Sequence, residues 1–412
     1  EGIGEGGGTR DTGDDQVARP GDPSRSGAAG DRPTTPARPG GRWGERPRRL
    51  FPVRVNGKWG CIDATGAPAI EPKFDNELVF AEGRAAVRFG RKWGYLDERG
   101  EAVVEPQFDF VSPFSEGFGL VCALGDTSRG ARAPLLGYVD RDGGIIVRPQ
   151  FKDADAFHEG FALCWVDGKA GFLDTSGQFA IAAQFPEAER LSEGLAAVAP
   201  SGRWGFIDQT GRTAIAPQFD HVWPFCEGRA VVACGAKRGY INRAGELVVE
   251  PRFDSACPFS EGLARVNVGG AVGDGGPFEG GRYGFVGRGG SVVIEPVLEH
   301  TGDFSEGLAS VVEKGKWGYI DKTGSVVIAP QFSSAWEFSE ELARVAVAER
   351  PSEHAGFPWG KCGFIDKTGA IVIEVQFDRC EDFSGGLARV EIGGKRGYIS
   401  RSGAYVWEPS RQ

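Results

Sequence analysis

The sequence predicts an all-β protein built from a tandem array of about ten repeat units, and three observations support this prediction. The phrase "KGKWGYIDKTG" at Lys314–Gly324 recurs almost unchanged as "GRKWGYLDERG" at Gly90–Gly100. The 65 glycines among 412 residues are more than twice the usual share of roughly 7%, which indicates many tight turns. Apolar residues alternate with period two in the recurring segments, as in strands, without a helical period.

The composition restricts the classes of function. The 40% hydrophobic and 25% charged residues are typical of a soluble globular protein. The net charge of -10 argues against nucleic-acid binding, which normally needs a basic face. No apolar run reaches the roughly 18 residues of a membrane helix, so we expect no membrane span. The chain lacks a signal-peptide pattern and contains no methionine. We therefore expect a processed chain or a fragment, either cytoplasmic or exported.

Residues 1–50 differ in composition from the rest. The stretch "TGDDQVARPGDPSRSGAAGDRPTTPARPGG" is rich in Gly, Pro and Arg and has almost no apolar residues. Such a segment cannot bury enough surface to offset its chain entropy. We predict a disordered N-terminal segment over 1–50 and the repeat array over 51–412.

The repeat has a period of 34 residues with three insertions. Each unit is marked by an anchor position, the residue before the Gly of "WGYID", and consecutive anchors are 34, 43, 34, 34, 34, 45, 34, 45 and 34 residues apart. The insertions of 9, 11 and 11 residues all follow the equivalent residues Val121, Val266 and Val345. The ten anchors are Trp59, Trp93, Leu136, Ala170, Trp204, Arg238, Tyr283, Trp317, Cys362 and Arg396.

Three short strands are predicted in each unit. "WGYID" alternates, "D-x-x-G" is a hairpin turn, "SVVIAPQF" is a β-branched strand that ends in a core Phe, and "LASVV" is the third strand. Three strands in 34 residues are few for a propeller blade, and ten units exceed the usual roughly four to eight blades. We therefore expect an open, solenoid-like stack of three-stranded hairpin units, with a β-propeller or closed ring as the alternative.

These motifs resemble the WG-repeat (KWG) family of tandem bacterial β-repeat proteins over Phe51–Pro409. The Gly after the anchor is present in all ten units, although only four anchors are Trp, and Gly287, Asn242 and Ser400 replace the turn Asp. The resemblance implies a tandem β-repeat protein without catalytic activity, and it implies no substrate.

Recurring carboxylates are the first candidates for catalysis. A glycosidase would pair two of them across a cleft, but a catalytic pair needs one unit that differs from the others. We interpret the Asp as setting the hairpin turn and the Glu as accepting backbone N–H groups at the "SEG" corner. The recurring positions are Glu82, Glu116, Glu159, Glu193, Glu227, Glu261, Glu306 and Glu340, and Asp63, Asp97, Asp140, Asp174, Asp208, Asp321 and Asp366.

Metal, cofactor and phosphate sites are not indicated. His158, His221, His300 and His354 are assigned to four different positions of the unit, without ligand spacing. The eight cysteines form no CxxC pair and are expected to be unpaired packing residues. The Gly-rich stretch Gly269–Gly281 lacks the Lys-Ser/Thr of a phosphate-binding loop and is interpreted as a flexible loop.

We therefore predict a non-catalytic binding scaffold for a protein partner, with no cofactor and no metal. The three insertions are expected to share one edge, where Phe278, Phe357 and Trp359 are candidate partner-binding residues. The alternative is a carbohydrate or cell-envelope-binding module that uses the Trp and Tyr anchors. Half of the anchor positions lack an aromatic residue, which favours structural cover over sugar stacking.

Overall fold

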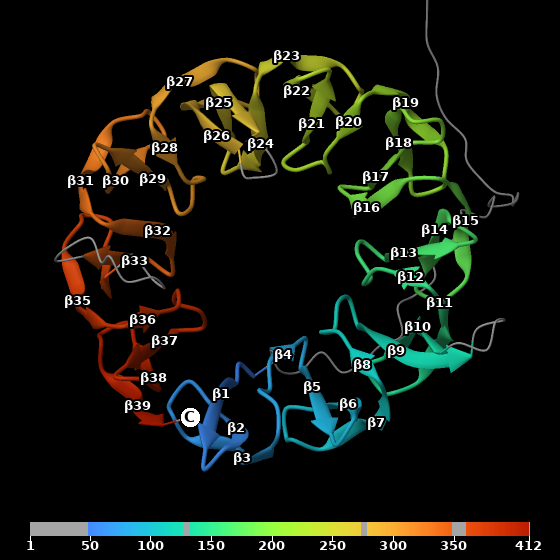
Figure 1. Ribbon diagram of the computed structural model, residues 1–412, viewed down its shortest axis with the longest axis vertical. Helices are drawn as coiled ribbons and strands as arrows, with labels where there is room; N and C mark the ends of the chain where they lie inside the picture. The colour runs from blue at the N-terminus through green and yellow to red at the C-terminus, as the bar shows by residue number, and fades with distance from the viewer. Residues whose placement is uncertain (1–47, 127–131, 273–277, 348–359, 412) are drawn as a thin grey trace, which may run out of the picture. The chain divides into compact units, whose positions relative to one another are not determined.

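The computed structural model describes residues 48–126, 132–272, 278–347 and 360–411. Over these residues the chain forms ten antiparallel sheets arranged as the blades of a β-propeller (Figure 1). Blades 2 to 10 each have four strands in sequence order from the centre of the ring outward, and blade 1 has three among the described residues. No helix in this described part is long and apolar enough to cross a membrane.

The strands are grouped here by their position in the blade, from the inside outward. The innermost strands are β4 (Phe80–Ala81), β8 (Phe110–Val111), β12 (Asp153–Ala154), β16 (Ala188–Ser192), β20 (His221–Val222), β24 (Ser255–Ser260), β28 (His300–Thr301), β32 (Ser334–Ser339) and β36 (Arg379–Cys380). The second strands are β1 (Phe51–Val55), β5 (Arg84–Phe89), β9 (Phe118–Asp126), β13 (Phe161–Val166), β17 (Leu195–Val198), β21 (Arg229–Cys234), β25 (Leu263–Val272), β29 (Leu308–Glu313), β33 (Leu342–Val347) and β37 (Leu387–Ile392).

The third and outermost strands complete each blade. The third strands are β2 (Lys58–Ile62), β6 (Lys92–Leu96), β10 (Arg132–Asp140), β14 (Lys169–Asp174), β18 (Trp204–Asp208), β22 (Lys237–Asn242), β26 (Phe278–Gly287), β30 (Lys316–Asp321), β34 (Lys361–Ile365) and β38 (Lys395–Ser400). The outermost strands are β3 (Pro68–Phe74), β7 (Ala102–Phe108), β11 (Ile145–Phe151), β15 (Phe179–Phe185), β19 (Thr213–Phe219), β23 (Leu247–Phe253), β27 (Val292–Leu298), β31 (Val326–Phe332), β35 (Ile371–Phe377) and β39 (Tyr405–Arg411).

The preference for an open solenoid was wrong, and the alternative of a propeller is what the structure shows. The three predicted strands are present in every unit, but the segment between the core Phe and "F-S-E-G" adds a fourth, innermost strand. In blade 8 this strand is only His300–Thr301, which pairs with Val312 and Val311. Six of the nine innermost strands have only two residues, which is too short for an alternating pattern in the sequence, so the unit was counted one strand short.

The recurring Phe at the end of each outermost strand lies in the core, as predicted. Its eight occurrences are all buried: Phe74, Phe108, Phe151, Phe185, Phe219, Phe253, Phe332 and Phe377. Ring contacts extend this core within and between blades. Tyr319, which is fully buried, meets Phe338 of the next blade edge to face at 5.0 Å between centroids. Each blade therefore packs its aromatic residues against its neighbours.

The two invariant glycines have separate physical reasons. A Cβ on Gly318, at the Gly after an anchor, would collide with the backbone oxygen of Ile328 on the next strand, where the register shifts between Trp317 and Tyr319. Gly324 in the "D-x-x-G" turn has φ +86°, which favours glycine. The turn Asp acts as predicted, because Asp321 Oδ1 accepts the N–H groups of Thr323 at 2.9 Å and Ser325 at 3.0 Å. The hydroxyl of Thr323 also donates to this carboxylate, and these hydrogen bonds lower the pKa of Asp321.

Candidate functional site

The recurring glutamates fasten each blade to the next. Glu82 of blade 2 accepts the backbone N–H groups of Glu116 at 2.8 Å and Gly117 at 2.7 Å in blade 3. Glu116 accepts those of Glu159 and Gly160 of blade 4, both at 2.7 Å. Equivalent carboxylates bind the corresponding turn at every junction from blade 2 through blade 10, via Glu159, Glu193, Glu227, Glu261, Glu306 and Glu340.

This carboxylate chain confirms that the glutamates accept backbone N–H groups, but the sequence did not show that the acceptor and donor lie in different blades. Glu82 itself has φ +52°, a left-handed conformation that is uncommon outside Gly and Asn. Partial burial raises the pKa of Glu82, yet the N–H groups of Gly117 and Glu116 and the guanidinium of Arg141 hold it below its usual value. Hairpin turns usually have Asn or Gly at a left-handed position. The recurring Glu at this position was therefore the sequence signal that the residue has a role beyond the turn.

The ring closes without a covalent link where blade 10 meets blade 1. The Phe51 and Tyr398 rings meet edge to face at 5.5 Å, and the Tyr398 hydroxyl donates to the Pro52 carbonyl at 2.9 Å. In other blades the equivalent Tyr donates to the innermost segment of the next blade, as Tyr319 does to the Trp336 carbonyl at 2.7 Å. The innermost strand of blade 1 is absent from the described residues, so Tyr398 binds the second strand instead.

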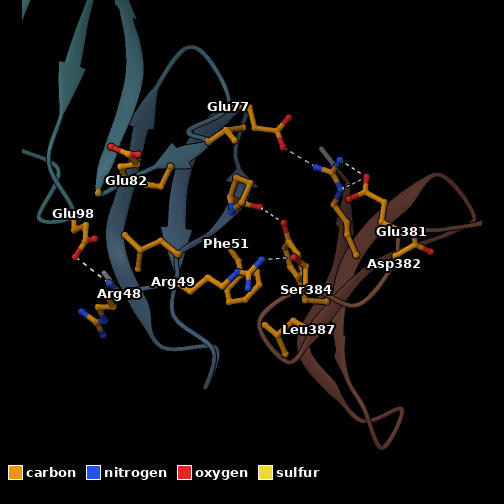
Figure 2. A pocket seen from close by; sticks show the side chains of 17 residues that line it. Arg48, Arg49, Phe51, Glu77, Glu82, Glu98, Glu381, Asp382, Ser384 and Leu387 are labelled. Atoms are coloured by element: carbon orange, nitrogen blue, oxygen red, sulfur yellow. Dashed lines mark hydrogen bonds and ion pairs between the residues drawn. The ribbon is translucent and has the colours of Figure 1, made fainter. Parts of the chain in front are cut away.

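A pocket of about 570 Å³ lies at this seam, and Figure 2 shows its lining side chains. Arg389 donates to Glu77 at 2.6 Å and to Glu381 at 2.8 Å, so it connects blade 10 with the segment that leads into blade 2. Arg49 donates to the Ser384 hydroxyl, and the Arg48 N–H donates to Glu98 at 3.2 Å.

The series of Glu carboxylates that bind the next blade stops at blade 10, beside the seam pocket. Gly385 occupies the repeat position of the glutamates, and a Cβ there would collide with the Arg49 side chain. Most charged groups around the pocket therefore bind one another or the seam itself. Among the described residues, polar side chains of blade 10 and of the segments around blade 1 therefore connect the two ends of the ring.

A second cavity, of about 520 Å³, lies beside the innermost strands of blades 8 and 9. Its walls include basic and acidic groups, Arg265, Asp303, Glu337 and Asp382, and aromatic groups, His300, Trp317 and Trp336. Arg265 Nε lies 3.2 Å from Asp303, and Arg344 Nε lies 3.3 Å from Asp382. Arg344 also stacks over Trp336, with its Cζ 4.1 Å from the ring centroid.

Burial and neighbouring charges shift the pKa values of three side chains around the second cavity. Burial and the charges of Asp303 and Asp382 raise the pKa of Glu337. Burial likewise raises the pKa of Asp382, although Arg344 opposes the effect. Burial and the neighbouring Arg265 lower the pKa of His300, which keeps its imidazole neutral near pH 7.

The histidine assignment needs a correction. His221 and His300 occupy the same position of the unit, the first residue of the innermost strand, and not two different ones. Each lies edge to face on the anchor of the preceding blade, with ring centroids 5.3 Å apart for His221 and Trp204 and 5.2 Å apart for His300 and Tyr283. His354 lies outside the described residues. No cluster of three potential metal ligands occurs among the residues that the structure describes.

The anchor positions are partly buried, as structural cover requires. Trp59 and Trp204 are buried, whereas Trp93 and Trp317 are half-buried. Arginines lie over two of these rings, with Arg54 at 5.8 Å from the Trp59 centroid and Arg88 at 5.7 Å from that of Trp93. These contacts favour a packing role for the anchors over a repeated sugar-stacking role.

Two cysteines are paired, which contradicts the expectation of unpaired residues. Cys362 on β34 of blade 9 and Cys380 on β36 of blade 10 form a disulfide with a Cα–Cα distance of 6.2 Å. The other six cysteines are free. The disulfide joins the anchor of one blade to the innermost strand of the next, a contact that spacing along the chain could not reveal.

The insertions lengthen one kind of turn. Strands β9 and β10 each have nine residues and β25 and β26 each have ten, compared with six and five for β5 and β6. Within the stretch Gly269–Gly281, residues 269–272 continue β25 and residues 278–281 begin β26, which the expectation of a loop did not include, and residues 273–277 lie outside the described residues. Phe278 begins β26, but its side chain lies outside the described residues, as do Phe357 and Trp359. The structure thus does not test these three candidates.

The comparisons with known proteins complete this description. No curated protein matches the sequence. The fold is similar to that of Hsv2p from Kluyveromyces lactis, with a TM-score of 0.33 and 9% identity over 63% of this chain and 97% of that chain. It is also similar to AztD from Citrobacter koseri, with a TM-score of 0.30 and 15% identity over 77% of this chain and 91% of that chain.

The sequence itself matches the family described as "WG containing repeat" nine times. The matched residues are 59–93, 93–125, 137–169, 171–199, 204–237, 239–270, 283–317, 317–348 and 363–395. Most of these matches begin at or next to an anchor, so each spans the third and outermost strands of one blade and the first two strands of the next. Together they cover most of the propeller. The chain therefore belongs to the WG-repeat family.

Proposed function

We propose that this propeller is a non-catalytic scaffold that binds a protein partner on the rim formed by the turns between second and third strands. The observation that supports the proposal is the lengthening of the β9–β10 and β25–β26 hairpins at this rim. Equivalent turns of a ring of blades lie on one face, so the end of β33 and the start of β34, between which the third insertion occurs in the sequence, belong to the same rim. Insertions on one face of a repeat protein commonly form its binding face.

Exposed apolar side chains occur on the same hairpins. Leu124 on β9 is 46% exposed, Val268 on β25 is 43% exposed and Val347 on β33 is 41% exposed. Apolar groups beside charged ones are typical of interface centres. In contrast, the recurring carboxylates are engaged by backbone N–H groups and turn residues, which favours a binding function over a catalytic one.

A pair of matched variants tests this proposal. The double substitution Leu124→Asp and Val268→Asp places charge on the rim, whereas Ile145→Asp and Leu247→Asp place it on outermost strands at residues of the same exposure, 46% and 43%. Proteins that the unmodified full chain captures should be lost by the rim variant and kept by the outer-strand variant. Equal capture by both variants would contradict the proposal. Micromolar binding of ordinary wall polysaccharides on a glycan array would support the carbohydrate alternative instead.

A further inference from the structure

Blade 7 ends its outermost strand differently from most other blades. Eight blades have a buried Phe at this position, including Phe253 and Phe332 in the blades on either side, whereas blade 7 has the half-buried Leu298. The residue before it is Gln, Lys or Arg in those eight blades and Val297 in blade 7. Blade 7 therefore presents apolar surface at a place where the other blades have a buried ring and a polar side chain.

A hollow of about 520 Å³ lies beside these two residues, between the outermost strands β27 and β31 on the outside of the ring (Figure 1). The buried Val311 and Ile320 are among the residues that line this outer hollow. Val297 and Val326 also line it, and they are 66% and 58% exposed. Exposed apolar surface around a concave centre is typical of a site that binds another protein.

Aromatic rings lie at the equivalent place at other junctions. Phe151 of blade 3 meets Phe179, the first residue of the outermost strand of blade 4, edge to face with 6.1 Å between centroids. A second pair of this kind joins blades 9 and 10 at 6.5 Å. At the junction of blades 7 and 8 the corresponding residues are Leu298 and Val326. Neither is aromatic, so the outer hollow offers an aromatic side chain of a partner the contacts that rings make elsewhere.

Two charged residues at the outer hollow indicate which groups flank this side chain. In five other blades the basic residue before the anchor forms an ion pair with the acidic residue after the Phe, as Lys237 does with Asp254 at 2.6 Å. The corresponding residues of blade 7, Arg282 and Glu299, are exposed and both line the outer hollow. Neither forms an ion pair among the residues that the structure describes. Each is therefore available to an opposite charge on a partner.

The outer hollow also adjoins the rim. Arg282 on β26 is the direct cross-strand partner of Val268 on β25 in the lengthened hairpin. Val268 is one of the exposed apolar residues of the rim. A protein that covers this hairpin therefore also reaches the outer hollow.

We propose that the outer hollow binds a phenylalanine side chain of the protein partner, flanked by an acidic residue that pairs with Arg282 and a basic residue that pairs with Glu299. The ring packs against Leu298 and Val326, in the place where aromatic pairs lie at other junctions. This inference rests on the proposed protein-binding function and adds the kind of residue that the partner presents.

The first test uses the full chain with labelled Val and Leu methyl groups and the probe Nα-acetyl-phenylalanine N-methylamide, followed by methyl NMR. We expect saturable shifts of the Val297, Leu298 and Val326 signals. Leu298→Phe restores the residue of the other blades and should weaken binding of the probe by about tenfold or more, because its own ring fills the outer hollow. Leu247→Phe adds the same ring at an exposed residue of β23 and should leave the affinity unchanged.

The second test addresses the flanking charges. The tripeptide amides acetyl-Asp-Phe-Lys and acetyl-Lys-Phe-Asp carry the ring with the same two charges in opposite order. We expect one of them to bind severalfold more tightly than the uncharged probe and to lose this advantage in Arg282→Gln. Lys395→Gln removes a positive charge at the same position of blade 10 and should leave the advantage intact.

Four results would overturn the proposal: no saturable shift, equal binding of Nα-acetyl-alanine N-methylamide, unchanged binding in Leu298→Phe, or no gain from either tripeptide. Self-association of the full chain that Leu298→Phe abolishes in sedimentation would assign the outer hollow to a second copy instead. The outcome is separable from the test of the rim. If the rim variant loses the partner while the probe fails to bind, the scaffold function holds and the outer hollow has no part in it.

Discussion

Two kinds of junction hold the ring together, the regular junctions between neighbouring blades and the seam between blade 10 and blade 1. They use different contacts. At the junction of blades 8 and 9, Glu306 accepts the N–H of Glu341 at 3.0 Å, Ser305 donates to the Phe338 carbonyl at 2.8 Å, and Tyr319 donates across the junction. At the seam only the Tyr398 hydrogen bond persists, with a new acceptor, and arginine side chains replace the rest.

The difference shows which links are built into the repeat and which are specific to its ends. Regular links join the backbone of one blade to repeated side chains of another, such as Glu306 and Ser305. The seam depends on ion pairs of long side chains, such as that of Arg389 with Glu381, whose side chain is 56% exposed. Exposed ion pairs contribute little to stability, so we expect the seam to be the weakest junction of the ring.

Removing blades 9 and 10 should have the largest effect. A chain that ends shortly after Phe332, the last residue of blade 8, would lose its closure and expose two blade faces. We expect it to lose its cooperative thermal transition by circular dichroism and to aggregate in size-exclusion chromatography. A truncated chain that remains monomeric and melts within a few degrees of the full chain would mean that the blades are stable as an open array.

Removing the disulfide should have an intermediate effect. The bond closes a loop with a sequence separation of 18 and joins the last blade to the ring. The double substitution Cys362→Ala and Cys380→Ala should lower the free energy of unfolding by about 3 kcal/mol in the chain-entropy description, measured by chemical denaturation. Cys61→Ala, at a free buried cysteine, serves as the control for lost packing alone. An unchanged denaturation midpoint in the double variant would show that the last blade is already fixed by its other contacts.

Removing single hydroxyls should have the smallest effect and gives the sharpest comparison. Tyr319→Phe and Tyr398→Phe each delete one hydrogen bond, at 2.7 Å in a regular junction and at 2.9 Å in the seam. Each should cost about 1 kcal/mol. Native-state hydrogen exchange should then show Tyr398→Phe increasing exchange in β1 and β39, while Tyr319→Phe affects blades 8 and 9. Identical exchange patterns would mean that the seam is not a separate weak point.

The sequence was sufficient for the family, the number of units and the core, because these depend on features that every unit repeats. The buried Phe219 and the turn Asp321 are examples in which one residue performs one local role. Closure was not predictable in the same way. It depends on the contacts between neighbouring blades, such as that of the Glu82 carboxylate with the Glu116 N–H, and the 34-residue period carries no information about them.

The candidate site was less accessible to sequence reasoning than the fold. Phe278, Phe357 and Trp359 were chosen as aromatic residues within insertions, but insertions have no repeat register from which to infer their surroundings. The lining of the cavity beside blade 8 includes Gly302, which follows β28, and Ser310 on β29, where blade 9 has Trp336 and Arg344. An alignment of the units against one another would have marked both as exceptions, although not the cavity that they line.

The carboxylate chain has a consequence for how such a ring can change in size. In each regular unit, the Glu carboxylate accepts hydrogen bonds from the turn of the next unit, and turn N–H groups donate to the Glu of the preceding unit. Glu116 does both, because its carboxylate accepts the N–H of Glu159 and its own N–H donates to Glu82. A duplicated or lost unit inside the array therefore meets compatible neighbours on both sides without any further substitution. Only the terminal units carry residues that mark an end, such as Arg49 and Gly385. Recombination within the array can thus change the number of blades without disturbing the links between them. The residues specific to the two terminal units decide where the ring is joined.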